Sequence, residues 1–190
     1  MTCPVETFTV GALRVRIEPD EEPSDPRDAD NLGTMICLHR HYQLGDPHEY
    51  RAEDHAGWAD LEQHILRDHP GAVVLPLYMM DHSGLSISTS DVTFRAFDSA
   101  GWDWGRVGLT YADAASIRAE YGVRRIGRRL RERVEDLLRA EVEEYDRFLS
   151  GDAYCYAIED PDGQVVDSCC GLLGLDHAVA EARAAAEALA

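Results

Sequence analysis

The consecutive residues Asp81, His82 and Ser83 have the side chains in this sequence that are best suited to chemistry. A carboxylate can orient an imidazole, and the imidazole can act as a general base near neutral pH or as a metal ligand. Further along the chain, Trp102 can supply a dry wall or a stacking face, and Asp103 adds a second carboxylate. The pattern predicts a small-molecule or metal-assisted hydrolytic pocket, with Asp81, His82, Ser83 and Asp103 as catalytic candidates.

The same residues also fit a structural role, because Asp81-His82-Ser83-Gly84 separates the two apolar, β-type halves of the segment 73–89. Asp81 and Ser83 can bond neighbouring backbone groups, and Gly84 can take a positive φ, so the four residues suit a tight turn between two strands. Consecutive strand residues point to opposite faces, so Asp81 and His82 converge only if the turn redirects one of them. Both interpretations stay open.

Histidines offer a second place to look for a metal. His39 and His41 follow the predicted strand 33–38 and would share one strand face, which presents two metal nitrogens. A third ligand is missing nearby in the sequence, so surface histidines are the simpler interpretation. His64 and His69 are spaced to lie on different faces of a helix. We therefore predict no cofactor, and a divalent metal remains possible.

Hydrophobic periodicity predicts a single α+β domain over residues 1–190 with a mainly antiparallel sheet, because the strands and helices alternate irregularly and several strands are joined as hairpins. The acidic, proline-rich segment 19–30 is expected to be a mobile loop. A long amphipathic helix over 127–149 should bury its apolar stripe. The remaining expected elements are strands at 13–17, 33–38, 106–111, 153–159 and 164–168 and helices at 58–69, 112–121 and 176–190, the last capped by Asp176.

The five cysteines include no CxxC pair, and their odd number argues against a closed disulfide framework. We expect reduced thiols throughout. Cys169 and Cys170 are adjacent and alternate across a strand, so one should lie in the core and the other nearer the surface. The sequence contains neither a long apolar span nor the features of a signal peptide, which favours a cytoplasmic protein.

The composition is strongly acidic, with 36 acidic side chains against 18 basic ones, all of them arginine, and a formal net charge of −18. Such acidity is often a solubility trait, and it can also form a binding surface. Six arginines nevertheless gather between Arg124 and Arg133. They could contact phosphates, yet the overall charge repels nucleic acid and acidic neighbours can neutralise them, so we expect salt bridges and no direct nucleic-acid partner.

Several short sequence motifs of this chain resemble those of a family of uncharacterised proteins carried by bacteriophages, plasmids and related elements. The resemblance covers about residues 30 to 180 and implies a mobile-element setting more than a reaction. The chain departs from the family at Trp104 and Arg106, where the family has a small residue and a glutamine. The motifs are Asp30-Asn31-Leu32-Gly33-Thr34-Met35, His39-Arg40 with Tyr42 and Leu44-Gly45-Asp46, Pro76-Leu77-Tyr78 with Asp81-His82-Ser83-Gly84, and Trp102-Asp103 with Gly105 and Val107-Gly108.

Standard motifs for nucleotide binding, zinc proteolysis and serine hydrolysis are missing from the sequence. The first functional expectation is therefore a mobile-element accessory protein that binds a host or element protein through an acidic, DNA-like surface, as an antirestriction protein would. Eighteen charges match roughly 30 Å of duplex, so they suffice only if they are concentrated on one face. The alternative is the hydrolytic pocket. Six residues are candidates for binding a ligand: Asn31, His39, Arg40, Tyr42, Asp46 and Trp102.

Overall fold

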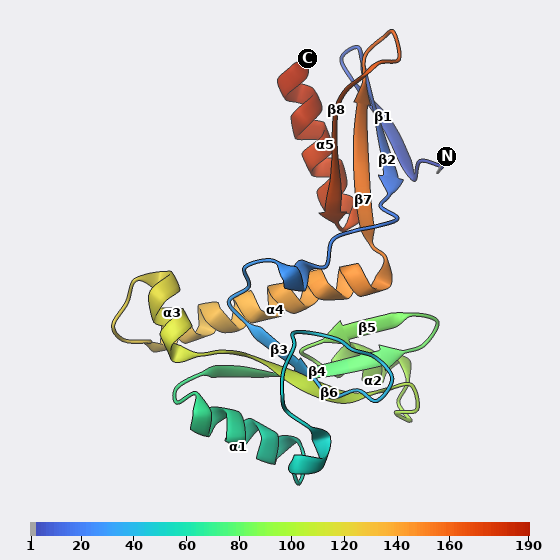
Figure 1. The fold of residues 1–190 in the computed structure, drawn as a ribbon. Coiled ribbons are helices and arrows are strands. Elements are labelled where there is room, and N and C mark those ends of the chain that lie inside the picture. Colours follow the sequence, from blue (N-terminus) through green and yellow to red (C-terminus); the bar gives the residue numbers. More distant parts are fainter. Residues whose placement is uncertain (1–2) are drawn as a thin grey trace. The chain divides into compact units, whose positions relative to one another are not determined.

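The computed structural model describes residues 3–190, which group into two compact units (Figure 1). Unit 1 comprises the chain up to Pro26 together with Arg147–Ala190, and unit 2 comprises Arg27–Asp146. Each unit contains one four-stranded sheet, and all the strand pairs recorded in the described chain are antiparallel. The α+β class, the antiparallel pairing, the long helix and the C-terminal helix are thus confirmed.

Unit 1 is a sheet with one helix packed on it. Its strands are β1 (Glu6–Val10), β2 (Leu13–Pro19), β7 (Ala153–Glu159) and β8 (Val165–Leu173), in the order β1-β2-β7-β8, and α5 (Leu175–Leu189) follows. Alternation along β2 buries Val15 and Ile17, and these residues pack against α5. The helix presents Ala178, Ala182 and Ala186, whose small side chains let it lie close to the sheet.

Unit 2 has the strand order β3-β6-β4-β5. Helices α1 and α4 cover opposite faces of this sheet, because Leu109 and Tyr111 of β6 pack with α1 while Ala112 packs with α4. Its strands are β3 (Thr34–Cys37), β4 (Val73–Asp81), β5 (Leu85–Ser88) and β6 (Trp104–Ala112). Its helices are α1 (Trp58–Asp68), α2 (Val92–Phe97), α3 (Ala114–Tyr121), α4 (Arg128–Ser150, through Asp146 in this unit) and two short 3-10 turns, η1 (Pro26–Asp28, from Arg27 in this unit) and η2 (Ala52–Asp54).

A buried carboxylate of α4 holds the chain just before β3. Glu141 is 8% exposed and accepts the amide protons of Leu32 (2.8 Å) and Gly33 (3.0 Å). Burial raises the pKa of Glu141, while these amides and the Arg27 guanidinium oppose the rise. Gly33 has no side chain at a place where a Cβ would collide with Leu138 and Glu141. The Asn31-Leu32-Gly33 motif therefore has a clear packing role.

The expectation for the cysteines was wrong in two respects. Cys155 and Cys170 form a disulfide between neighbouring strands, although the odd number of cysteines had favoured free thiols throughout. Cys169 and Cys170 are both exposed, because β8 is an edge strand whose two faces stay accessible. Cys37 is a buried free thiol, and burial raises its pKa to about 12.

Several element boundaries also differ from those expected. Strand β1 was not predicted, β6 begins earlier at Trp104, and β8 continues to Leu173. Helix α5 begins at Leu175 after Gly174, so Asp176 lies inside the first turn and does not cap it. The cause is Gly174, whose φ of 91° turns the chain directly from the strand into the helix.

The arginines at the start of α4 are engaged in different ways. Arg128 pairs with Glu132 at 2.9 Å, as expected for an i,i+4 salt bridge. Arg131 instead donates to the backbone carbonyl of Ala72, and Arg133 lies 5.2 Å from the centre of the Tyr121 ring. Within residues 3–190, no helix combines the length and apolarity that crossing a membrane requires.

Candidate functional site

The predicted turn between β4 and β5 is present, and it redirects His82. Asp81 pairs with Leu85 across the hairpin, and the His82 amide donates to the Gly84 carbonyl (3.2 Å). Ser83 has a φ of 61°, in the left-handed region that non-glycine residues seldom occupy. The turn and site interpretations are therefore compatible, because the turn lets neighbouring side chains leave the strand alternation.

His82 lies against Asp103, with 2.8 Å between Nδ1 and Oδ2. The two chain segments are also joined by the Asp81 amide, which donates to the Asp103 carbonyl at 2.8 Å. An ionised carboxylate can only accept, so a neutral imidazole donates from Nδ1 and keeps a lone pair on Nε2. The side chains are 50% and 40% exposed, so water and small molecules reach them.

The carboxylate that orients His82 is thus Asp103, whereas Asp81 bonds elsewhere. The Tyr42 hydroxyl donates to Asp81 Oδ2 at 2.9 Å, and this hydrogen bond is the main reason that the pKa of Tyr42 is raised. The His39 ring stacks on Tyr42, with 5.0 Å between ring centres and 13° between planes. Residues from the segments 39–42, 81–83 and 102–103 therefore meet at the end of the unit 2 sheet where β4 ends and β6 begins.

Asp98 positions this site and was missed by the sequence analysis. Its Oδ2 accepts the amide protons of Trp102 (2.6 Å) and Asp103 (3.0 Å), and its Oδ1 accepts that of Ala100 (3.0 Å). The Asp103 amide is the largest cause of the lowered pKa of Asp98; partial desolvation opposes it, and the other loop amides assist. The available signal was an aspartate followed by small residues and Gly101, which is typical of a side chain that closes a turn.

Aromatic side chains flank the imidazole. The Phe97 ring lies edge-on to His82, with 5.3 Å between ring centres, and it is 63% exposed. Trp102 is 88% exposed, so it is available as a surface contact and does not serve as core. Exposed rings of this kind can hold the apolar part of a ligand.

Three of the predicted binding residues, His39, Tyr42 and Asp46, line one pocket of about 460 Å³. His39, Arg40 and Tyr42 line a shallow pocket of about 620 Å³. Asp46 is occupied internally, since it accepts two hydrogen bonds from Arg27 (3.0 and 2.6 Å) and one from the Met35 amide (2.7 Å). Asn31 lines a separate pocket together with Glu141.

Another polar pocket in unit 2, of about 470 Å³, was also missed. His48, His55 and His64 line it together with Tyr50, because the loop before α1 folds onto that helix. The His55 and His64 rings are 5.2 Å apart, and His64 pairs with Asp68 at 3.3 Å. The ligand atoms do not form a compact group of three here; in the described chain, one such group is found, in unit 1.

No family model, curated protein or solved structure matches this chain. Function is therefore inferred from the geometry and charge of the chain itself.

Proposed function

We propose that unit 2 hydrolyses a small neutral or cationic ester or amide, with His82 as the general base. The observation that supports the proposal is the 2.8 Å contact between His82 Nδ1 and Asp103 Oδ2, which leaves the lone pair of Nε2 to take a proton on a side chain that is 50% exposed. A carboxylate that orients the imidazole assists general-base catalysis, because it fixes the tautomer and stabilises the imidazolium.

The proposed reaction uses one proton acceptor, His82, and one nucleophile, a water molecule. Nε2 takes a proton from a water molecule, and the water oxygen adds to the carbonyl carbon. The imidazolium then gives the proton to the alcohol oxygen or amine nitrogen as its bond to the carbonyl carbon breaks. Asp103 stabilises the imidazolium and keeps the ring in the required tautomer. Ser83 can replace water as the nucleophile, in which case an acyl-enzyme forms first.

Charge favours an uncharged or cationic substrate. Asp103 contacts the imidazole, and the carboxylates of Asp81 and Asp98 belong to the two chain segments that carry this pair, so a phosphate ester would be repelled. Phe97 offers an apolar contact for the remainder of the molecule.

The test is hydrolysis of p-nitrophenyl acetate and p-nitrophenyl phosphate by the wild type and by His82→Ala. We expect activity on the acetate, with kcat/KM lowered about 100-fold in His82→Ala. His41→Ala is the matched control, because His41 is an exposed histidine of a nearby loop that lacks a carboxylate contact in the described structure. Equal activity of His82→Ala and the wild type would exclude the proposal.

Ser83→Gly separates the two nucleophiles. Glycine accepts the positive φ of this position, so the variant should fold normally. Retained activity indicates attack by water, whereas loss of activity together with a missing burst phase indicates Ser83. Dialysis against a chelator distinguishes a metal-assisted reaction from a metal-free one.

A second function, that of a mobile-element accessory protein which binds a basic surface of a host or element protein, is favoured by the charge of unit 1. This unit carries 14 acidic residues against 4 arginines, a net charge of −10 in 70 residues, whereas unit 2 carries 22 against 14, a net charge of −8 in 120 residues. The net negative charge per residue is therefore about twice as high in unit 1 as in unit 2.

Pull-down at low and high salt tests this second function. Glu21→Gln/Glu22→Gln in unit 1 should weaken a salt-sensitive partner, while Glu143→Gln/Glu144→Gln in unit 2 removes the same charge from another exposed place. Failure to recover a salt-sensitive partner, or equal weakening by both variants, would argue that the acidity serves solubility.

A further inference from the structure

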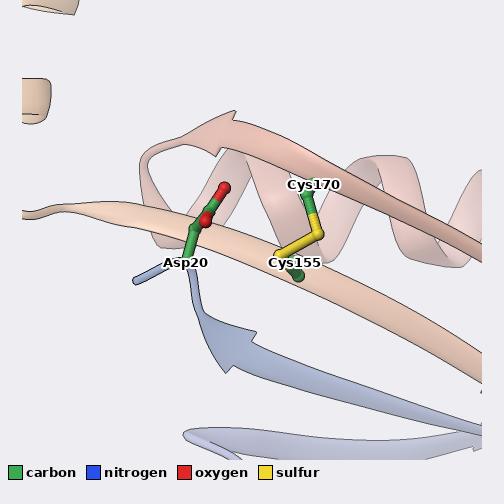
Figure 2. A group of neighbouring side chains, drawn as sticks. All are labelled: Asp20, Cys155 and Cys170. Carbon is green, nitrogen blue, oxygen red and sulfur yellow. A yellow bond between two sulfur atoms is a disulfide. The ribbon is translucent and has the colours of Figure 1, made fainter. Parts of the chain in front are cut away.

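Two sulfurs and one carboxylate meet on the sheet of unit 1 (Figure 2). A carboxylate oxygen of Asp20 and the Sγ atoms of Cys155 and Cys170 all lie within 4.8 Å of one another. Asp20 directly follows β2, Cys155 lies in β7 and Cys170 lies in β8, so the sheet brings the three residues together.

The group lies on the face of the sheet that α5 leaves open. Tyr154 and Tyr156 pack with the α5 core, so Cys155 between them points to the other face. Glu18 is the β2 partner of Cys155 in the strand register and adds a nearby carboxylate. The Glu18 carboxylate pairs with Arg16 at 2.8 Å, so the surroundings are polar and the attraction for a cation comes from Asp20.

Asp20 is held in place independently of the sulfurs. Its amide donates to the Ala153 carbonyl (2.8 Å), and its two oxygens accept the amide protons of Gly171 (2.9 Å) and Glu22 (3.1 Å). Gly171, with a φ of 76°, turns its amide toward the carboxylate. Each carboxylate oxygen keeps a further lone pair for a metal ion.

We propose that reduction of the Cys155–Cys170 disulfide converts this group into a zinc site with two thiolate ligands and the Asp20 carboxylate. A dithiol reductant supplies two electrons and two protons and itself becomes a disulfide. Zn²⁺ then displaces the two thiol protons to solvent. A water molecule completes four-coordination.

The required geometry is within reach of side-chain rotation alone. Two Zn–S bonds of about 2.3 Å at a tetrahedral angle separate the sulfurs by roughly 3.8 Å. The Cα atoms of Cys155 and Cys170 are 4.0 Å apart and lie at the irregularity of the β7–β8 register between Tyr154 and Tyr156. Cys169 is the register partner of Tyr156 and shares its face, so it is not a ligand.

The experiment titrates Zn²⁺ against the full chain in competition with a chromogenic chelator, before and after reduction by a phosphine. We expect one Zn²⁺ per reduced chain and none per oxidised chain. Co²⁺ should give thiolate-to-metal absorption in the reduced chain only. The melting temperature of the reduced chain should also rise with Zn²⁺, since the metal binds the folded state.

Matched variants identify the ligands. Cys170→Ser should lower the affinity at least about 100-fold, and Asp20→Asn at least about 10-fold, while Cys169→Ser keeps it unchanged. The single oxygen of asparagine can replace one of the two Asp20 acceptors, for the Gly171 amide or for the Glu22 amide. Circular dichroism verifies that each variant is folded.

Three results would overturn the inference. The first is the lack of stoichiometric Zn²⁺ binding by the reduced, folded chain. The second is equal binding by the Cys155→Ser/Cys170→Ser variant, which would place the metal at other residues such as the histidines of unit 2. The third is undiminished affinity of Asp20→Asn, which would remove Asp20 from the site.

Discussion

Asp98 stabilises the candidate site although it does not contact the imidazole. Its carboxylate accepts three amide protons within the loop that carries Asp103, and the Trp104 indole donates to its backbone carbonyl (2.7 Å). Loss of this carboxylate frees the loop, and Asp103 then leaves the position that orients His82. Asp98 is therefore a positioning residue.

Asp98→Ala should abolish the His82–Asp103 contact while the sheet of unit 2 remains intact. The expected signature in NMR spectra is loss of the preferred His82 tautomer, with unchanged amide shifts in β4 and β6. Asp91→Ala is a matched control, because Asp91 pairs with Arg95 on the nearby helix α2. An unchanged tautomer in Asp98→Ala would contradict this role.

The pH dependence of the loop follows from the lowered pKa of Asp98. A carboxyl group with a lowered folded-state pKa contributes stability above its ordinary pKa of 3.8, and this contribution is lost as the pH falls through the folded-state value. In the wild type, amide exchange of Trp102 and Asp103 should thus accelerate as the pH falls through the folded-state pKa of Asp98. In Asp98→Ala the acceleration should be missing.

At the scale of elements, Gly108 sets how closely β3 and β6 approach. It pairs with Cys37, and a Cβ at this position would overlap the carbonyl oxygen of Ile36. Backbone cannot give way as a flexible side chain can, so the two strands must separate if any side chain is added. The close approach of β3 and β6 therefore explains the glycine of the Val107-Gly108 motif.

Gly108→Ala should lower the free energy of unfolding by about 3 kcal/mol or more, because it breaks the β3–β6 pairing. Gly105→Ala on the same strand is the control, since a Cβ there meets no atom within 4 Å; its effect should stay within about 0.5 kcal/mol. Urea unfolding of both variants measures the difference. Equal stabilities would show that the strands can relax.

At the scale of the whole molecule, the net charge of −18 opposes folding through self-repulsion. Raising NaCl from about 0.1 M to about 1 M shortens the screening length from about 10 Å to about 3 Å. The melting temperature should therefore rise over this range, and it should rise less for Glu143→Gln/Glu144→Gln. A flat or falling melting temperature would show that self-repulsion is not a significant cost.

The sequence alone was sufficient for most of the elements and for part of the candidate site, but it predicted neither β1 nor α2. Periodicity located α1, α4 and the β4–β5 hairpin, because the burial of one face of a helix or strand is written in the spacing of apolar residues. Residue type likewise marked His82 and Asp103 as chemically capable. Exposed strands were harder to locate. Strand β8 is an edge strand with few buried residues, so its apolar pattern predicted a strand that ended too early, at residue 168.

Tertiary structure alone decided which residues pair. Asp103, not Asp81, orients His82, because a turn breaks the strand alternation that sequence spacing assumes. Cys155 and Cys170 bond because β7 and β8 are neighbours with a register irregularity between Tyr154 and Tyr156, which an odd cysteine count does not reveal. The physical reason is common to both cases: spacing predicts a face, whereas contacts between faces depend on register and turn geometry, which are set by the packing of the whole unit.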